Sequence, residues 1–228
     1  MSLDEKAWQA VAARIEGAAG RVGRDPAGVR VLAVSKGQPA TAVRAAHALG
    51  QRAFGENYVQ EAVAKAAELA DLPQIEWHMI GPLQTNKARL AAQLFAWVQS
   101  VDRLKIAERL SVARDSQLPP LNVCVQVNIS GEQSKSGVAP GDAGALAQAV
   151  AKLPRLALRG FMGIAEETGD VDRQRRQFRV LREIFDAARA DGLALDTLSM
   201  GMSADLEAAV AEGATMVRIG TALFGPRM

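Results

Sequence analysis

The chain has 228 residues, of which 49% are hydrophobic and 23% charged, a composition typical of a globular protein with a packed core. Its 27 lysines and arginines against 25 aspartates and glutamates leave a net charge of +2, which argues against a broad basic surface for nucleic acid or anionic membranes. One cysteine excludes an internal disulfide framework, and two histidines argue against a His-rich metal centre. No apolar run approaches ~20 residues and the N-terminal segment lacks an apolar signal core, so we expect a cytoplasmic protein without a membrane span.

In chain order, a helix is expected first, over Asp4–Ala19, and short apolar strands then alternate with segments of helical period. The expected strands are Val29–Ser35, Arg52–Phe54, Ile75–Ile80, Phe95–Val101, Leu121–Ile129, Leu156–Met162, Thr197–Met200 and Met216–Ile219. The expected helices between them are Pro39–Leu49, Gln60–Ala70, Asn86–Gln93, Arg103–Ser116, Gly141–Lys152, Val171–Ala190 and Ala204–Glu212.

Eight such strand–helix units in fewer than ~250 residues predict an α/β fold, a single (β/α)₈ TIM barrel. The alternative is an open doubly wound sheet, which is disfavoured because no G-x-G-x-x-G motif follows the first strand. No linker or shift in composition marks a second domain. We therefore expect one domain over residues 1–228, with the barrel at about residues 29–225.

Functional residues of such barrels lie at the carboxyl ends of the strands, and the first strand ends in Ser35-Lys36-Gly37. A lysine at the lip of an apolar barrel is partly desolvated, which lowers the pKa of its amine and favours Schiff-base formation with an aldehyde. The alternative is an ordinary solvent-exposed lysine. Cys124, between two valines, is expected in the core.

The seventh and eighth strands are followed by Gly201-Met202-Ser203 and Gly220-Thr221. Phosphate is often held after these two strands in TIM barrels, and small residues and hydroxyls suit it. Helix capping is the alternative, since Ser203 is also a good N-cap residue. Arg218 interrupts an apolar strand, so it contacts a ligand or forms an internal ion pair, for example with Asp102 or Glu56.

An aldehyde-binding lysine, a phosphate site and an arginine together suggest pyridoxal 5′-phosphate (PLP). The same parts would also serve a Schiff-base aldolase acting on a sugar phosphate, and the residue types alone leave both possibilities open. Asn57, His78 and Asn128 are further candidates for the barrel mouth, although a histidine within a strand is more often a hydrogen-bonded core residue.

The sequence closely resembles the pyridoxal phosphate homeostasis protein family (YggS/PROSC type) from about Val29 to Gly225. The resemblance is carried by four groups of motifs: Val34-Ser35-Lys36, residues 54–61 (FGENYVQE), residues 77–87 (WHMIGPLQTNK), and the pair of residues 199–205 (SMGMSAD) and 217–225 (VRIGTALFG). The joint occurrence of these motifs is highly specific.

The resemblance implies a fold-type III barrel like the alanine racemase N-terminal domain, with PLP bound. By position, Lys36 would form the Schiff base and Arg218 would face the pyridine nitrogen. Lys135 matches a family lysine that is a candidate for a secondary cofactor contact or transfer site. The family often has another lysine two residues after the Schiff-base lysine, and this chain has Gln38 at that position. The remaining expected cofactor-binding residues are Asn57 and His78 near the ring, Ser203, Gly220 and Thr221 at the phosphate, and Met200.

The expected role is intracellular PLP homeostasis and delivery to apo-enzymes, without efficient catalysis, by a monomer that binds no metal. A racemase of this fold type needs a second base from another domain, for which the predicted barrel leaves no sequence, and the single tyrosine is Tyr58. The alternatives are a low-activity, PLP-dependent racemase-like enzyme and a scaffold barrel that uses no cofactor.

Overall fold

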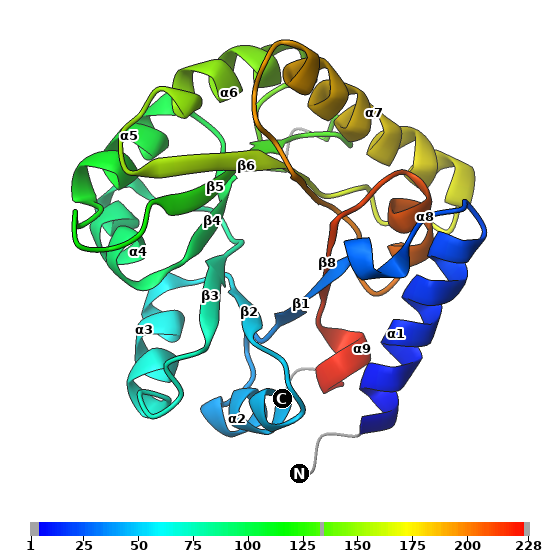
Figure 1. Ribbon diagram of the computed structural model, residues 1–228, viewed down its shortest axis with the longest axis horizontal. Coiled ribbons are helices and arrows are strands. Elements are labelled where there is room, and N and C mark those ends of the chain that lie inside the picture. The colour runs from blue at the N-terminus through cyan, green and yellow to red at the C-terminus, as the bar shows by residue number, and fades with distance from the viewer. Residues whose placement is uncertain (1–4, 133–134, 226–228) are drawn as a thin grey trace.

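The computed structural model describes residues 5–132 and 135–225. Its centre is a closed barrel in which each parallel strand pairs with the next and β8 pairs with β1, as Figure 1 shows. This closure confirms the TIM barrel and excludes the open sheet. The strands are β1 (Arg30–Val34), β2 (Ala53–Glu56), β3 (Glu76–Met79), β4 (Trp97–Val101), β5 (Leu121–Val127), β6 (Leu156–Gly163), β7 (Thr197–Ser199) and β8 (Met216–Ile219).

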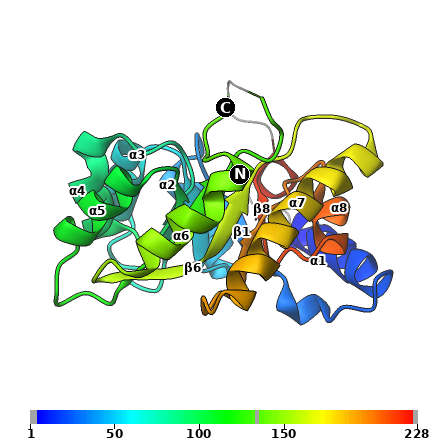
Figure 2. The same ribbon diagram turned by 90° about the horizontal axis from the view of Figure 1, so that it is seen from above.

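Helices form the outer layer and lie against the strands in the side view of Figure 2. They are α1 (Glu5–Gly20), α2 (Ala40–Ala48), α3 (Val59–Glu68), α4 (Ala88–Leu94), α5 (Leu104–Ala113), α6 (Ala143–Ala151), α7 (Val171–Ala190), α8 (Leu206–Ala211) and α9 (Thr221–Phe224). The predicted bounds of α7 agree with the structure, and the predicted start of the first helix, Asp4, lies outside the described residues. Helix α9 was not predicted, because four residues are too short for a periodic pattern.

The first helix, α1, closes the outer layer between α8 and α9 (Figure 1). Trp8 meets the ring of Phe224 edge to face, with the ring centroids 6.4 Å apart. Arg14 Nε donates to Glu207 Oε1 at 2.6 Å and Arg14 Nη2 donates to the Ser203 carbonyl at 2.9 Å. Helix α1, which precedes the barrel, is therefore bound to α8, which follows β7, and to α9, which follows β8.

The main core lies between the strands and the helices, where alanine-rich helix faces pack on large side chains such as Phe54, Phe161 and Phe178. The barrel interior is different. It holds small apolar clusters, one of which contains the fully buried Cys124, as expected from the sequence. It also holds buried polar side chains, which include His78, Gln99, Ser199 and Arg218. Buried polar groups of this kind require hydrogen-bond partners.

Close backbone contact between β6 and β7 requires a glycine. Gly160 has φ +154°, and a Cβ at this position would lie 1.8 Å from the Thr197 carbonyl oxygen. The register of β5 against β6 also shifts between Val123 and Cys124. Such irregularities bend a strand locally, as closure of a barrel requires.

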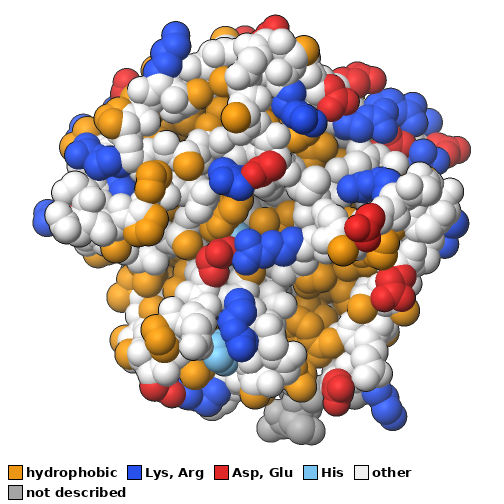
Figure 3. Space-filling view, viewed as in Figure 1, with side chains coloured by type: hydrophobic (Ala, Val, Ile, Leu, Met, Phe, Trp, Pro, Cys, Tyr) orange, Lys and Arg blue, Asp and Glu red, His pale blue; other side chains and the backbone are white. Residues whose placement is uncertain are grey.

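Among the described residues, no helix is long and apolar enough to cross a membrane. Figure 3 shows the end of the barrel at which the strands begin, with acidic and basic side chains over its centre. Two ion pairs belong to the starts of these strands: Arg30 Nη2 with Glu76 Oε1 at 2.9 Å, and Arg159 with Asp196. This end is therefore closed by paired charges, and the cavity described next opens at the other end.

Candidate functional site

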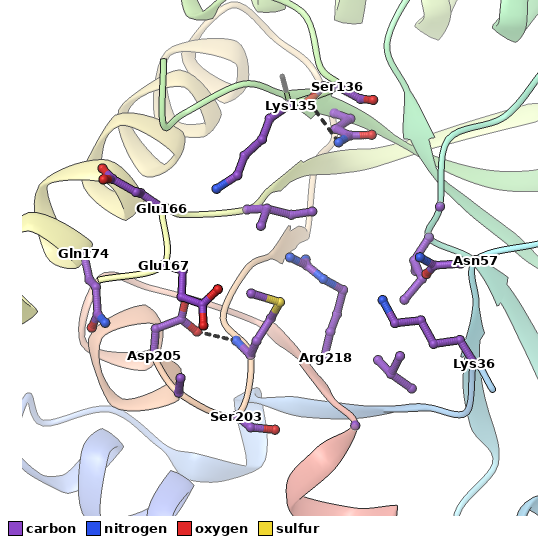
Figure 4. A pocket seen from close by; sticks show the side chains of 18 of the residues that line it. Lys36, Asn57, Lys135, Ser136, Glu166, Glu167, Gln174, Ser203, Asp205 and Arg218 are labelled. Atoms are coloured by element: carbon purple, nitrogen blue, oxygen red, sulfur yellow. Dashed lines mark hydrogen bonds between the residues drawn. The ribbon is translucent and has the colours of Figure 1, made fainter. Parts of the chain in front are cut away.

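A cavity of about 810 Å³ lies at the carboxyl ends of the strands (Figure 4). Eight of the ten residues predicted for the site line it, namely Lys36, Asn57, Asn128, Lys135, Ser203, Arg218, Gly220 and Thr221. The other two, His78 and Met200, are fully buried and are not among the lining residues. In Figure 4, Lys36 and Asn57 lie on one wall, Lys135 and Glu166 on the opposite wall, and Arg218 between them.

Lys36 follows β1 in a turn whose two flanking residues are both held by side chains. Gly37 has φ +70°, which a residue with a side chain rarely adopts. Its N–H donates to Glu61 Oε1 at 2.6 Å. On the other side, Ser35 Oγ donates to Glu56 Oε1 at 2.6 Å, and the Ser35 carbonyl accepts from Lys65 Nζ at 2.6 Å. The turn thus carries Lys36 on a backbone fixed from both directions.

Lys65 joins these contacts into one cluster, since its ammonium also donates to Glu56 Oε1 at 2.8 Å and to Glu61 Oε1 at 2.7 Å. Burial raises the pKa of Glu56 despite its hydrogen bonds from Lys65 and Ser35. Burial also acts to raise the pKa of Glu61, but hydrogen bonds from Lys65 and the Gly37 N–H hold it below its usual value. Lys65 was not among the predicted site residues, although it lies on the same face of α3 as the buried Val59 and Ala62.

Arg218 reaches the cavity from β8 and makes its hydrogen bonds to β6 and β7. Its Nη1 donates to the Ser199 carbonyl at 2.7 Å and to Ser199 Oγ at 2.9 Å, and its Nη2 donates to the Gly163 carbonyl at 2.8 Å. The alternative of an ion pair with Asp102 or Glu56 is therefore wrong, because the guanidinium points across the barrel to carbonyl oxygens. Burial lowers the pKa of Arg218 to about 10, so the side chain stays charged at neutral pH.

Ser203 does not cap the helix that follows it, so the helix-capping alternative for this residue is wrong. The N-cap of α8 is Asp205, whose carboxylate instead accepts from the Met202 N–H at 2.5 Å. Ser203 lies in the preceding turn, where its hydroxyl accepts from the Ala222 N–H at 3.4 Å and lines the cavity next to Thr221. The hydroxyl is therefore available to a ligand as a donor.

Asn57 is placed by contact between the loops after β2 and β3. A Cβ on Gly81 would lie 2.3 Å from the Asn57 carbonyl oxygen, so only glycine permits this approach. Across the cavity from Asn57, burial raises the pKa of the Asp205 carboxyl group.

The wall opposite Lys36 comes from the loops after β5 and β6. Lys135 Nζ donates to the Ala165 carbonyl at 3.0 Å and pairs with Glu132 Oε2 at 2.6 Å. Glu166, Glu167, Thr168 and Gln174 complete this wall. These four residues were not among the predicted site residues, although a polar run soon after the predicted strand Leu156–Met162 is itself a signal for the barrel mouth.

These groups match the chemistry of a phosphorylated aldehyde. A lysine amine can bond to an aldehyde carbon, while two hydroxyls and a glycine backbone suit phosphate oxygens. A buried, charged guanidinium suits a ring nitrogen that carries a lone pair. Within the described residues, no group of three or more His, Cys, Asp or Glu side chains lies close enough together to hold a metal ion.

Comparison with known proteins agrees with this geometry. Residues 7–228 match the family model described as alanine racemase, N-terminal domain. The chain is 64% identical over 217 residues to the pyridoxal phosphate homeostasis protein of Pseudomonas aeruginosa, covering 95% of this chain and 93% of that protein. It is 51% identical over 216 residues to the protein of the same name from Escherichia coli K12, covering 94% and 92%. Among solved structures, PipY of Synechococcus elongatus with PLP bound is 41% identical, has a TM-score of 0.81, and is matched over 93% of this chain and 100% of that chain.

Proposed function

Because this chain belongs to the family of pyridoxal phosphate homeostasis proteins, we propose that it binds PLP in the cavity at the barrel mouth and keeps the cofactor for delivery within the cell. The observation that carries the proposal is the convergence of Lys36, Arg218, Ser203 and Thr221 on one cavity. The PLP-bound structure of PipY, a relative that matches nearly the whole chain, supports the same ligand.

PLP supplies an aldehyde and, when bound, an aromatic ring that can accept electrons from a bonded amine. Lys36 is the residue proposed to bond to the aldehyde as a Schiff base. Ser203, Thr221 and the backbone of Gly220 would hold the phosphate, and Arg218 would face the pyridine nitrogen. A guanidinium does not readily give up a proton, so this ring is a poorer electron sink than one paired with a carboxylic acid.

A role without efficient catalysis is supported by the position of Tyr58. This residue is the single tyrosine of the sequence, it is 66% exposed, and it does not line the cavity. An amino-acid racemase needs a base on each face of its substrate, and Lys36 supplies only one. The runner-up, a racemase-like enzyme of low activity, would require another cavity residue such as Lys135 to supply the second base.

We also propose a cytoplasmic monomer, with no nucleic acid or membrane partner. The net charge of +2 supports the absence of nucleic-acid and membrane partners, because a single small phosphate ester needs only a local site and no broad basic surface. Sedimentation of the loaded protein at several concentrations tests the monomer, and a dimer that persists on dilution would overturn it.

The central experiment is the absorption spectrum of the purified protein after addition of PLP, followed by borohydride reduction and location of the modified lysine by mass spectrometry. We expect the modification on Lys36, and its loss in Lys36→Ala. Lys135→Ala is the matched control, since Lys135 lies on the opposite wall of the same cavity. Modification of Lys135 in the unaltered protein would contradict the assignment.

Delivery has a separate test. The loaded protein is mixed with an apo-enzyme that depends on PLP, and recovery of that enzyme's activity is compared with recovery in free PLP at the same concentration. Faster recovery from the loaded protein supports delivery, and equal or slower recovery argues against it. Sustained formation of D-amino acids from a panel of L-amino acids would favour the racemase-like alternative instead.

A further inference from the structure

A line of hydrogen-bonded side chains crosses the barrel interior from Arg218 toward the end at which the strands begin. Arg218 Nη1 lies 2.9 Å from Ser199 Oγ, which lies 2.6 Å from Gln99 Oε1. Gln99 Nε2 lies 2.9 Å from His78 Nδ1, and His78 Nε2 lies 2.6 Å from Glu76 Oε1. We call these five residues the interior chain. They come from β8, β7, β4 and β3, so only closure of the barrel brings them together.

The two ends of the interior chain fix the direction of every hydrogen bond in it. A guanidinium only donates and a carboxylate only accepts. Ser199 Oγ accepts from Arg218 and therefore turns its own hydrogen toward Gln99 Oε1. The amide nitrogen of Gln99 then donates to His78 Nδ1, which leaves the ring hydrogen on Nε2, where it donates to Glu76.

Burial and stacking hold this arrangement in place. Ser199, Gln99 and His78 are each 0% exposed. Loss of a hydrogen-bond partner at any of them would destabilise the fold, because water cannot reach the unpaired group to replace the lost bond. The His78 ring stacks on Trp97, with centroids 5.2 Å apart and planes within 6°. Burial also lowers the pKa of His78, which favours the neutral ring that the chain of donors requires.

At the cavity end, the same contacts restrict the arginine. Two hydrogen bonds go to Ser199 and a third to the Gly163 carbonyl, so the guanidinium plane is fixed relative to β6 and β7. A guanidinium has five N–H groups. Donors therefore remain for a ligand in the cavity that Arg218 lines.

We propose that Ser199, Gln99, His78 and Glu76 are positioning residues that orient the Arg218 guanidinium for the pyridine ring of the cofactor, with His78 as the neutral Nε2–H tautomer. This inference rests on the proposed function in naming the ligand of Arg218. It also replaces the direct cofactor contact that the sequence predicted for His78 with an indirect role, in which His78 acts on Arg218 through Gln99 and Ser199 without lining the cavity.

The first test needs no cofactor. The sequence contains only two histidines, so ¹⁵N spectra of histidine-labelled apo-protein resolve His78 once His47→Gln has identified the other signal. We expect a protonated Nε2 and an unprotonated Nδ1 at neutral pH. A His78 protonated at Nδ1 would overturn the proposal, because Gln99 would then have to be reversed and the chain of donors would be broken.

The second test measures the dissociation constant of PLP in Ser199→Ala and Gln99→Leu. Each variant removes a link of the interior chain while leaving the cavity lining intact, and we expect each to weaken binding about five- to tenfold. The double variant should bind PLP no more weakly than the single variant with the larger loss of affinity, since both substitutions break the same chain of hydrogen bonds. Effects that multiply in the double variant would mean that the two residues act independently, and would refute the proposal.

Cys124→Ala is the matched control, since it shortens another fully buried side chain of the barrel interior that takes part in none of the hydrogen bonds of the interior chain. The His78 Nδ1 resonance should move in Ser199→Ala, which lies two contacts from the ring, and stay in place in Cys124→Ala. The reverse pattern would reduce the interior chain to ordinary packing. If the unaltered protein took up no PLP, the proposed function would fail, whereas the tautomer and the Nδ1 shifts in apo-protein would still decide the interior chain.

Discussion

Replacement of Lys65 by methionine is the sharpest test of how the turn that carries Lys36 is held. The side chain is 6% exposed, and its ammonium is the shared partner of Glu56, Glu61 and the Ser35 carbonyl. Lys65→Met keeps most of the buried volume and removes the charge. Glu61 can turn toward water, since its side chain is 26% exposed. Glu56 is 0% exposed, so its carboxylate cannot reach water.

The size of the effect follows from the proton equilibrium of Glu56. Breaking a buried ion pair costs about 3–5 kcal/mol, but a stranded carboxylate can escape by taking up a proton. That escape costs ~1.36 kcal/mol for each pH unit above the usual glutamate pKa of ~4.3, which gives at most about 3.7 kcal/mol at pH 7 and about 1 kcal/mol at pH 5. The structure already raises the pKa of Glu56, and loss of Lys65 raises it further.

The sign of the pH dependence follows from that upward shift. A group whose pKa is higher in the folded than in the unfolded protein contributes most below its unfolded pKa, and the contribution is lost as pH rises through the folded pKa. Lys65→Met should therefore lose stability relative to the unaltered protein as the pH is raised from 5 to 7. Glu56→Gln added to Lys65→Met should recover much of the loss at pH 7, because no charge is then stranded.

The assay is urea unfolding followed by the fluorescence of the three tryptophans at both pH values, with midpoints compared at unchanged slope. Lys152→Met, at an exposed lysine, is the control and should change stability by less than ~0.5 kcal/mol. The reasoning would be refuted by a loss below ~1 kcal/mol at pH 7, by a loss that did not shrink at pH 5, or by a double variant no more stable than Lys65→Met.

Three further outcomes are expected. Ser203→Ala combined with Thr221→Val should weaken PLP binding by more than about 2 kcal/mol, since each neutral hydrogen bond is worth ~1 kcal/mol and one to phosphate is worth more. An unchanged dissociation constant in a spectroscopic titration would mean that the phosphate is bound elsewhere. Cys124 should resist thiol reagents in the native protein and react only after unfolding, because it is fully buried and burial raises its pKa to about 12; rapid native labelling would contradict this. Gly81→Ala should lower both the unfolding midpoint and the PLP affinity, because its Cβ would lie 2.3 Å from the Asn57 carbonyl oxygen; a variant with unaltered midpoint and affinity would show that the loop yields freely.

Much of the architecture was accessible from the sequence. Each of the eight expected strands overlaps an observed one, because apolar runs and helical periods are local properties that survive in a barrel. The placement of Lys36 and Arg218 at the barrel mouth also followed, since parallel strands bring their carboxyl ends to one face. Helix α9 escaped prediction because its four residues are fewer than two helical turns.

The partners of the buried polar groups were decided by tertiary structure alone. The sequence offered Asp102 or Glu56 for Arg218, but β8 lies beside β7 in the closed barrel and directs the guanidinium to Ser199 and Gly163. Likewise, nothing local indicates that Glu56 meets Lys65. Hydrogen bonds and ion pairs depend on distances of about 3 Å between groups far apart in the chain, whereas strands and helices depend on the order of neighbouring residues. For this protein, the sequence by itself therefore determined the barrel and the residues at its mouth, while the closed barrel decided which atoms hold them in place.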